Sequence, residues 1–401
     1  LDMIQLCIAL KLQSSASFRA VSRTIVILSV YLDLATKAPC HSTILLWVKK
    51  YGHHELTGPK EVADDWVVIL DESVQFGQSK LLLVYGIRQS KIDFSRPLKY
   101  QDLCPLLLMC RSSWNGEAIK AQLMHVQEQI GCIRYAVADH GNNIKKAIRL
   151  MGIPHVYDLT HRISLSLEHI YKEDAEFRAF TKRMARLRGT QALGKMAHVL
   201  PPAQRCKARF MNLRPISDWG MAVLNFLDRP VNCFKDEKRS LAWVEGYRSL
   251  IVELAQLNRT INTIESELKN NGLSEKTIAK CASALEEGSA ERPQQFKQTM
   301  NEYFQQTMQS LNGIDKALCS SDILESSFGK YKNYLQANPM VGITNLCLSI
   351  PAFTGTLERE GLKAAFEGTK TENIETWTKS NIGETTLAKR LKVLKWGVNK
   401  N

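Results

Sequence analysis

The sequence predicts an α/β protein in which a mixed β-sheet follows a helical N-terminal module and is interrupted by a long helical insertion. Apolar residues in the first 57 positions recur every three or four residues, as on one face of a helix. Short apolar runs then alternate with helical segments up to residue 172, whereas residues 173 to 314 carry helical spacing alone. The predicted parts are therefore 1–57, 61–172, 173–314 and 315–401, and the last of them completes the sheet domain.

The N-terminal part is expected to form three short helices, at residues 1–12, 17–31 and 39–51. The second carries four apolar residues on one face: Phe18, Val21, Ile25 and Leu28. Gly52 is expected to end the third helix, because glycine commonly follows a helix C-terminus. Trp47 is expected to pack in a small core between the helices.

Two short helices joined by a tight turn, the second beginning with polar residues, are typical of a helix-turn-helix module. Such a module places polar and basic side chains against DNA. The candidate side chains are Arg19, Arg23, His41, Ser42, Lys49 and Lys50. The alternative is a helical cap or a dimerisation module that makes no DNA contact.

The sheet is predicted from five apolar runs, at residues 65–70, 79–87, 102–110, 133–138 and 154–157. Helices are predicted between and after them, at residues 117–130, 142–151 and 160–171. Three strands in succession, followed by strand and helix in alternation, indicate a mixed sheet with helices on its faces. An RNase H-like fold has this order of elements. Its first three strands form a meander, and its fourth and fifth strands add alongside the first.

The insertion, residues 173–314, is expected to be entirely helical, with Ser274 as the N-cap of one helix. Residues 178–214 hold ten Lys or Arg and no Asp or Glu. Such a stretch is suited to follow the backbone of a nucleic acid. The candidates are Lys182, Arg183, Arg186, Arg188, Lys207 and Arg209. The C-terminal tail, residues 387–401, is basic and is expected to form a surface helix.

The formal net charge of +13 favours a polyanionic partner, and nucleic acid ahead of an anionic membrane surface. A merely basic protein is the alternative. The ten cysteines form no CxxC pairs, which indicates reduced thiols in a cytosolic protein and gives little support for zinc. The expected location is the bacterial cytoplasm, in association with the nucleoid. No apolar run reaches the roughly 18 residues needed to span a bilayer, so no membrane partner is expected. The chain begins with Leu1, which leaves a preceding targeting segment open.

Two acidic residues occupy the ends of predicted strands that should be neighbours in the sheet. Asp71 follows the run VVIL directly, and Asp139 follows the run YAVA. Two carboxylates in one pocket repel each other unless a cation lies between them. Oxygen ligands of this kind suit Mg²⁺ or Mn²⁺. Two such ions about 4 Å apart support phosphodiester chemistry.

A third carboxylate would complete such a centre. Glu325 is the candidate, on a helix predicted after the insertion, and Asp322 lies one helical turn away. Each acid has a structural alternative, because Asp at a strand end is often a turn former or helix cap and Glu on a helix is often solvated. The joint pattern of strand-end acids, helical acid and basic insertion favours a nuclease centre.

The segment ADHGNNIKKAIRLMGIPHVYDLTHRIS carries a family resemblance. It resembles DDE transposases of bacterial insertion sequences, and the architecture is similar to the Mutator-like and hAT groups. Those enzymes have an aspartate, then Gly or Asn and a helix, then a short strand that leads to a Cys-x-x-His pair. Here Asp158 and His161 stand in DLTH, so the histidine matches and the cysteine does not. The resemblance covers residues 12–394, and each motif is short.

The resemblance implies that Asp71, Asp139 and Glu325 hold two Mg²⁺ or Mn²⁺ ions. It places His161 near the active centre, where it would touch the scissile phosphate or orient Asp158. The alternative for His161 is a satisfied histidine at a helix start. Trp219 would stack on a flipped base or pack in a core.

The implied activity is DNA strand cleavage and strand transfer at the terminal inverted repeats of an insertion sequence. The partners would be double-stranded terminal and target DNA and, because two ends are held together, a second or further copy of the chain. Three alternatives stay open. They are a catalytically inactive or domesticated DNA-binding derivative, a helix-turn-helix transcriptional regulator, and a nuclease without strand transfer.

Overall fold

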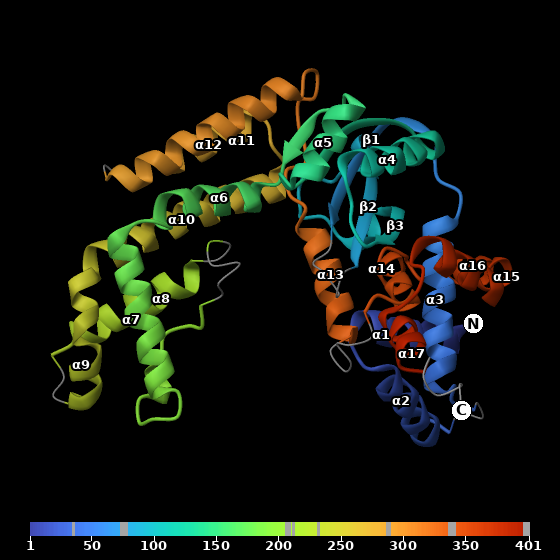
Figure 1. Ribbon diagram of the computed structural model, residues 1–401, viewed down its shortest axis with the longest axis horizontal. Coiled ribbons are helices and arrows are strands. Elements are labelled where there is room, and N and C mark those ends of the chain that lie inside the picture. The colour runs from blue at the N-terminus through green and yellow to red at the C-terminus, as the bar shows by residue number, and fades with distance from the viewer. Residues whose placement is uncertain are drawn as a thin grey trace. The chain divides into compact units, whose positions relative to one another are not determined.

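The computed structural model describes residues 1–33, 37–72, 79–204, 210, 213–230, 233–285, 290–335 and 342–395 (Figure 1). The chain divides into two compact units. The first comprises residues 1–93, 97–156 and 321–401, and the second comprises residues 94–96 and 157–320. The first unit holds the β-sheet, and the second is helical.

The sheet has five strands in the order β3-β2-β1-β4-β5. The strands are β1 (Ala63–Glu72), β2 (Lys80–Arg88), β3 (Cys104–Arg111), β4 (Gly131–Ala138) and β5 (His155–Tyr157). β2 pairs antiparallel with both β1 and β3, whereas β4 pairs parallel with β1. This mixed sheet confirms the predicted fold class, with a meander of three strands and the last two added beside the first.

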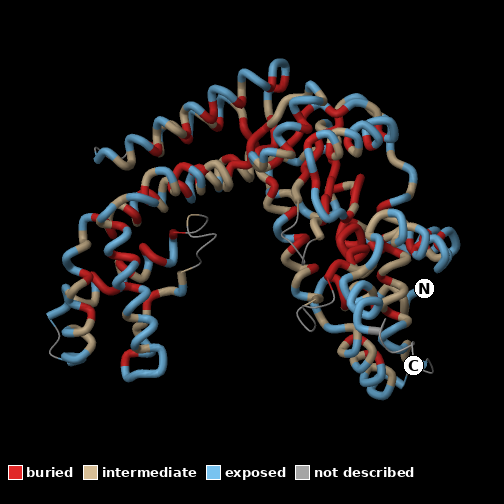
Figure 2. The backbone as a smooth tube through the Cα atoms, in the orientation of Figure 1, coloured by how far each residue is buried: buried red, intermediate tan, exposed pale blue. Residues whose placement is uncertain are grey.

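Both faces of the sheet are covered, which explains why its strands are nearly continuous apolar runs. On one face Val68 and Leu70 of β1 share a core with α4 (Gly116–Ile130) and α5 (Asn142–Met151). On the other face Tyr85 of β2 bonds to α13 (Asp322–Leu335) and α14 (Ser349–Ala352), through Ser327 Oγ at 3.1 Å and Ile350 O at 3.4 Å. The central strands are coloured as buried in Figure 2.

The N-terminal residues form α1 (Asp2–Gln13), α2 (Phe18–Tyr31) and α3 (His41–Thr57). Their small core contains Cys7, Val21, Ile25 and Ile44, and Trp47 packs against it as predicted. The expected turn between α2 and α3 falls in part on residues 34–36, outside the described residues.

The prediction that Gly52 ends the third helix is wrong, because α3 continues to Thr57. Gly52 lies where this helix meets the chain near Leu348. A Cβ atom at position 52 would lie 1.7 Å from the carbonyl oxygen of Leu348. The glycine therefore permits a close approach between two backbones and does not terminate a helix.

The N-terminal helices belong to the same compact unit as the sheet. The chain after α14 returns to them. Leu357 donates its backbone N–H to Tyr51 Oη at 3.0 Å and accepts from the side chain of Gln5 at 2.9 Å. α3 also packs against α15 (Arg359–Gly368) and α16 (Thr371–Asn381). Residues 1–57 are thus joined to the sheet domain by the C-terminal segment.

The second unit is helical, as expected of the insertion. Its α-helices are α6 (Leu159–Tyr171), α7 (Ala175–Gln191), α8 (Arg214–Leu227), α9 (Lys235–Leu241), α10 (Arg248–Asn271), α11 (Glu275–Ala284) and α12 (Glu291–Ser310). Ser274 accepts the N–H of Thr277 and caps α11, as predicted. The unit begins at residue 157 and not at 173, because α6 packs on α10 and α12 and Tyr303 Oη donates to Tyr157 O at 2.8 Å.

The described part of the C-terminal tail forms α17 (Thr386–Lys395), which is exposed, as expected of a surface helix. No helix within the described ranges has both the length and the apolar character needed to cross a membrane.

Candidate active site

The prediction that Asp71 follows its strand is wrong, because Asp71 is the penultimate residue of β1. It pairs with Leu83 of β2, and the ladder continues through Glu72 and Leu82. Polar residues can extend a strand when a neighbouring strand still offers backbone partners. The side chain of Asp71 is half-buried, at the C-terminal end of the most central strand.

Asp139 follows β4 directly, as predicted. In the parallel ladder between β1 and β4, Ile69 lies opposite Val137. Asp71 and Asp139 each stand two residues beyond this pair, so both occur at the same end of adjacent strands. The Asp139 Oδ1 atom accepts the backbone N–H of Gly141 at 2.9 Å, which fixes one carboxylate oxygen at the entry to α5.

The first turn of α13 carries both Asp322 and Glu325. This helix packs against β1, and two hydroxyl contacts hold it to the sheet domain. Ser327 Oγ lies 3.1 Å from Tyr85 Oη, and Tyr100 Oη donates to Ser326 Oγ at 2.7 Å. Tyr85 lies opposite Ile69 in the β1–β2 ladder. Helix α13 is therefore held to the sheet domain, in contact with the strand that carries Asp71.

The chemistry of these donors fits a hard divalent cation, because carboxylate oxygens are the ligands that Mg²⁺ and Mn²⁺ prefer. The ladder register brings Asp71 and Asp139 to one end of the sheet, with the acids of α13 on a helix packed on β1. Within the described ranges, no three His, Cys, Asp or Glu side chains are grouped closely enough to hold a metal ion. The choice between Glu325 and Asp322 as third ligand stays a prediction.

Two histidines beside Asp139 were not singled out from the sequence. The ring of His140 lies 5.1 Å from that of His155, the first residue of β5. His155 Nε2 lies 3.4 Å from the carbonyl oxygen of Ala138. Burial lowers the pKa of His155, so its imidazole is neutral at pH 7. The available signal was the position of His155 at the start of a strand expected beside β4.

His161 lies in the second unit, at the start of α6. Asp158 is fully buried and caps this helix. Its Oδ1 atom accepts the backbone N–H of His161 at 2.8 Å and lies 2.9 Å from the Nδ1 atom of the same residue. This geometry fits both alternatives, a histidine that is satisfied at a helix start and one that orients Asp158. A contact between His161 and a phosphate stays a prediction.

The basic candidates fall in both units. Arg19, Arg23, His41 and Ser42 are exposed on the N-terminal helices. Lys49 and Lys50 are half-buried, and burial lowers the pKa of Lys49. Four candidates are exposed on α7 of the second unit: Lys182, Arg183, Arg186 and Arg188. Lys207 and Arg209 lie outside the described residues.

Trp219 is half-buried on α8, and its indole N–H donates to Val199 O at 3.1 Å. One wall of a cavity of about 410 Å³ is formed by this ring together with Phe226 and Phe234. The centroid of the Trp243 ring lies 6.2 Å from that of Trp219. Trp219 therefore contributes both to an aromatic cluster and to a cavity wall. Base stacking by this ring stays a prediction.

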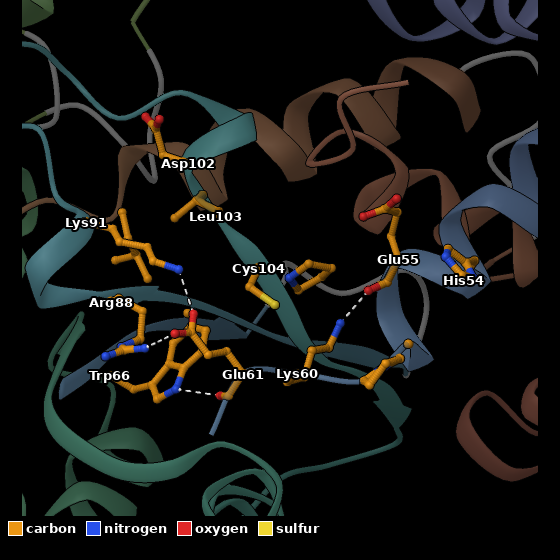
Figure 3. Close-up of a pocket in the computed structure, with 15 residues that line it drawn as sticks. His54, Glu55, Lys60, Glu61, Trp66, Arg88, Lys91, Asp102, Leu103 and Cys104 are labelled. Atoms are coloured by element: carbon orange, nitrogen blue, oxygen red, sulfur yellow. Dashed lines mark hydrogen bonds and ion pairs between the residues drawn. The ribbon is translucent and has the colours of Figure 1, made fainter. Parts of the chain in front are cut away.

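A charged pocket of about 530 Å³ lies at the opposite end of the sheet from Asp71 (Figure 3). Three cationic side chains of this pocket, Arg88, Lys91 and Lys60, bond to other residues that line it. Arg88 and Lys91 both donate to the carboxylate of Glu61 at 2.6 Å, and Lys60 donates to the carbonyl oxygen of Glu55 at 2.5 Å. The three cations are therefore satisfied by partners that line the pocket itself.

No family model and no curated protein matches the sequence. Among solved structures, the chain is similar to the Drosophila P element transposase strand transfer complex. The sequence identity is 11%, the match covers 90% of this chain and 92% of that chain, and the TM-score is 0.44. A likeness this distant assigns no activity to the chain.

Proposed function

We propose that the chain is a DDE-type DNA transposase that cleaves and joins DNA strands at the terminal inverted repeats of an insertion sequence. One observation carries the proposal. Asp71 and Asp139 stand at the same end of adjacent parallel strands in an RNase H-like strand order. Helix α13, which carries Asp322 and Glu325 in its first turn, packs against the strand that bears Asp71.

In this proposal Asp71, Asp139 and Glu325 hold two Mg²⁺ or Mn²⁺ ions, with Asp322 as the substitute for Glu325. Bound divalent ions supply activation of an attacking oxygen and stabilisation of a leaving oxygen in phosphodiester chemistry. The chain's own groups position the carboxylates. Gly141 N–H holds Asp139, and the hydroxyl contacts of Ser326 and Ser327 hold α13. The carboxylates act as ligands, so no covalent link between protein and DNA is expected.

DNA contact would come from the cationic surfaces. The net charge is +13, and five Lys or Arg are exposed along α7. Exposed Arg19, Arg23, His41 and Ser42 would supply contacts from the N-terminal helices. Transposition needs two DNA ends in one assembly, so the active form would contain at least two copies of the chain.

The test uses purified protein, Mg²⁺ or Mn²⁺, and duplexes that carry the inverted repeats flanking the gene. We expect strand cleavage that exposes a 3′-hydroxyl, followed by joining of that end to target DNA. Asp139→Asn should reduce cleavage by at least about 10³-fold, as expected when a group that stabilises the transition state is removed. Asp64→Asn, at the other end of β1 and exposed, is the matched control and should retain activity.

The outcomes separate the rival functions. Specific binding of the duplex without cleavage would indicate an inactive derivative or a regulator. Cleavage without joining would indicate a nuclease. Full activity in Asp139→Asn would overturn the proposed centre.

A further inference from the structure

Helix α2 carries an apolar surface at its C-terminal end. We define the α2 patch as Val26, Ile27, Val30, Tyr31 and the following Leu32. All five side chains are more than half exposed, and Val30 and Tyr31 reach 75% and 83%. Residues 26 and 30, like residues 27 and 31, are four apart and share one face of the helix. The opposite face, with Val21 and Ile25, fills the small N-terminal core.

The patch lacks the charge that a nucleic-acid contact needs. Residues 24–32 contain no charged side chain, whereas Arg19 and Arg23 lie in the first half of the helix. Binding to phosphates depends on Lys and Arg that displace counterions. The two halves of α2 therefore differ in chemistry. The first half is suited to DNA, and the second is suited to an apolar protein surface.

The size of the patch fits the centre of an interface. Together its side chains expose on the order of 500 Å², near the upper end of the ~300–600 Å² found for the largest apolar patch of a typical monomer. A stable association buries about 800 Å² on each partner, with an apolar centre and a polar rim. Arg23 and Thr24 on the preceding turn offer such a rim.

We infer that the α2 patch is the surface through which two copies of this chain associate. An uncharged apolar face is complementary to itself, and a two-fold interface places the same patch on both partners. The association would bring two first units together through their N-terminal helices. The use of this pairing to hold two DNA ends rests on the proposed function, but the association itself does not.

The experiment measures the molar mass of the DNA-free full chain by sedimentation equilibrium in the micromolar range. The test variant combines Ile27→Glu and Val30→Glu. Because both side chains are exposed, the substitutions leave the small core intact, and an unchanged thermal melt checks this. We expect a dimer for the unaltered chain and at least roughly tenfold weaker association for the variant. Val62→Glu is the matched control, since Val62 is 74% exposed outside α2, and it should dimerise like the unaltered chain.

A charge-swap mixture tests self-complementarity. A copy with Ile27→Lys and Val30→Lys should be monomeric alone and should form a mixed dimer with the Glu variant. A monomeric unaltered chain, or a Glu variant that dimerises as well as the unaltered chain, would overturn the inference. So would binding of the patch to neutral phosphatidylcholine vesicles in place of self-association. A dimer that fails to cleave DNA counts against the proposed function alone, and a monomer that cleaves counts against the pairing alone.

Discussion

Gly141 determines how closely the backbone approaches the Asp139 carboxylate. A Cβ atom at position 141 would lie 3.0 Å from Asp139 Oδ1, tighter than an ordinary contact. We expect Gly141→Ala to shift the carboxylate by a few tenths of an ångström. The expected result is at least about a tenfold loss of cleavage rate, because catalysis is sensitive to small misplacements. The measurement is the single-turnover cleavage rate together with a thermal melt.

Gly361→Ala is the control for this substitution. Gly361 lies on α15, and nothing lies within 4 Å of its added Cβ. The control should keep the full cleavage rate. If Gly141→Ala cleaves at the same rate as this control, the position of the Asp139 carboxylate is unimportant and the proposed centre loses its support.

At the residue scale, the position of a site residue was predictable where an apolar run in the sequence ends at the same residue as the strand. The apolar run of β4 stops at Ala138, so the position of Asp139 after the strand was predictable. The extension of β1 through Asp71 was not predictable, because it depends on backbone pairing with Leu83 on another strand and not on the residues next to Asp71 in the sequence. His155 was missed for a similar reason, since its burial beside Ala138 depends on the sheet order and not on its neighbours in sequence.

At the scale of elements, the close approach of α3 to Leu348 predicts a large cost for any side chain at position 52. A Cβ atom there would meet the Leu348 carbonyl oxygen and carbon at 1.7 and 2.8 Å, and both are backbone atoms that cannot rotate away. We expect Gly52→Ala to lower the free energy of unfolding by about 3 kcal/mol or more. Urea denaturation followed by circular dichroism measures the effect.

The matched control for position 52 is Gly329→Ala on α13. Nothing lies within 4 Å of a Cβ added there, so the substitution should be neutral or stabilise by about 0.5–1 kcal/mol through helix propensity. Equal stability of the two variants would contradict the described contact between α3 and Leu348.

Lys11 of α1 contacts Tyr334 of α13. From its burial we predict that the stability of the protein depends on pH. Its ammonium group lies 3.3 Å from the centre of the Tyr334 ring and donates to Ala16 O at 3.0 Å. Burial lowers the pKa of Lys11 from 10.5 to about 8. Between these two values the unfolded chain binds more protons than the folded chain, so stability rises with pH in this window.

The test compares the unaltered chain with Lys11→Met by urea denaturation at pH 7.5 and pH 9.5. Groups common to both chains cancel in the difference. We expect the unaltered chain to gain stability relative to Lys11→Met at the higher pH, because only it can release the buried proton. A difference that does not change with pH would show that Lys11 titrates normally in the folded chain.

Elements with a strong local pattern were predictable. The bounds of α5 are Asn142–Met151, as predicted from apolar spacing that ends before Gly152. The helical character of the insertion was also predictable from its spacing. The docking of the N-terminal helices was not, because it depends on contacts such as Gln5 with Leu357, which leave no local signal.

At the scale of the whole molecule, the strand order and the division into two units determine which part of the protein holds the candidate acidic residues. The five-stranded order puts β1 and β4 side by side, and Asp71 and Asp139 at one end of them. Helix α13, which carries the third acid, also belongs to the first unit, but in the sequence the whole helical second unit separates it from β4. A third acid separated in this way from the first two could be proposed from the family resemblance but not located by spacing.

The central claim is that Asp71 and Asp139 share bound divalent cations. Titration of Mn²⁺ into the DNA-free protein, followed by electron paramagnetic resonance of the free ion, measures this without knowledge of the DNA sequence. We predict saturable Mn²⁺ binding that weakens by at least about tenfold in Asp71→Asn and in Asp139→Asn, because each substitution removes a charged oxygen ligand. Asp64→Asn should bind as the unaltered chain does. Undiminished Mn²⁺ binding in both Asp71→Asn and Asp139→Asn would contradict the claim.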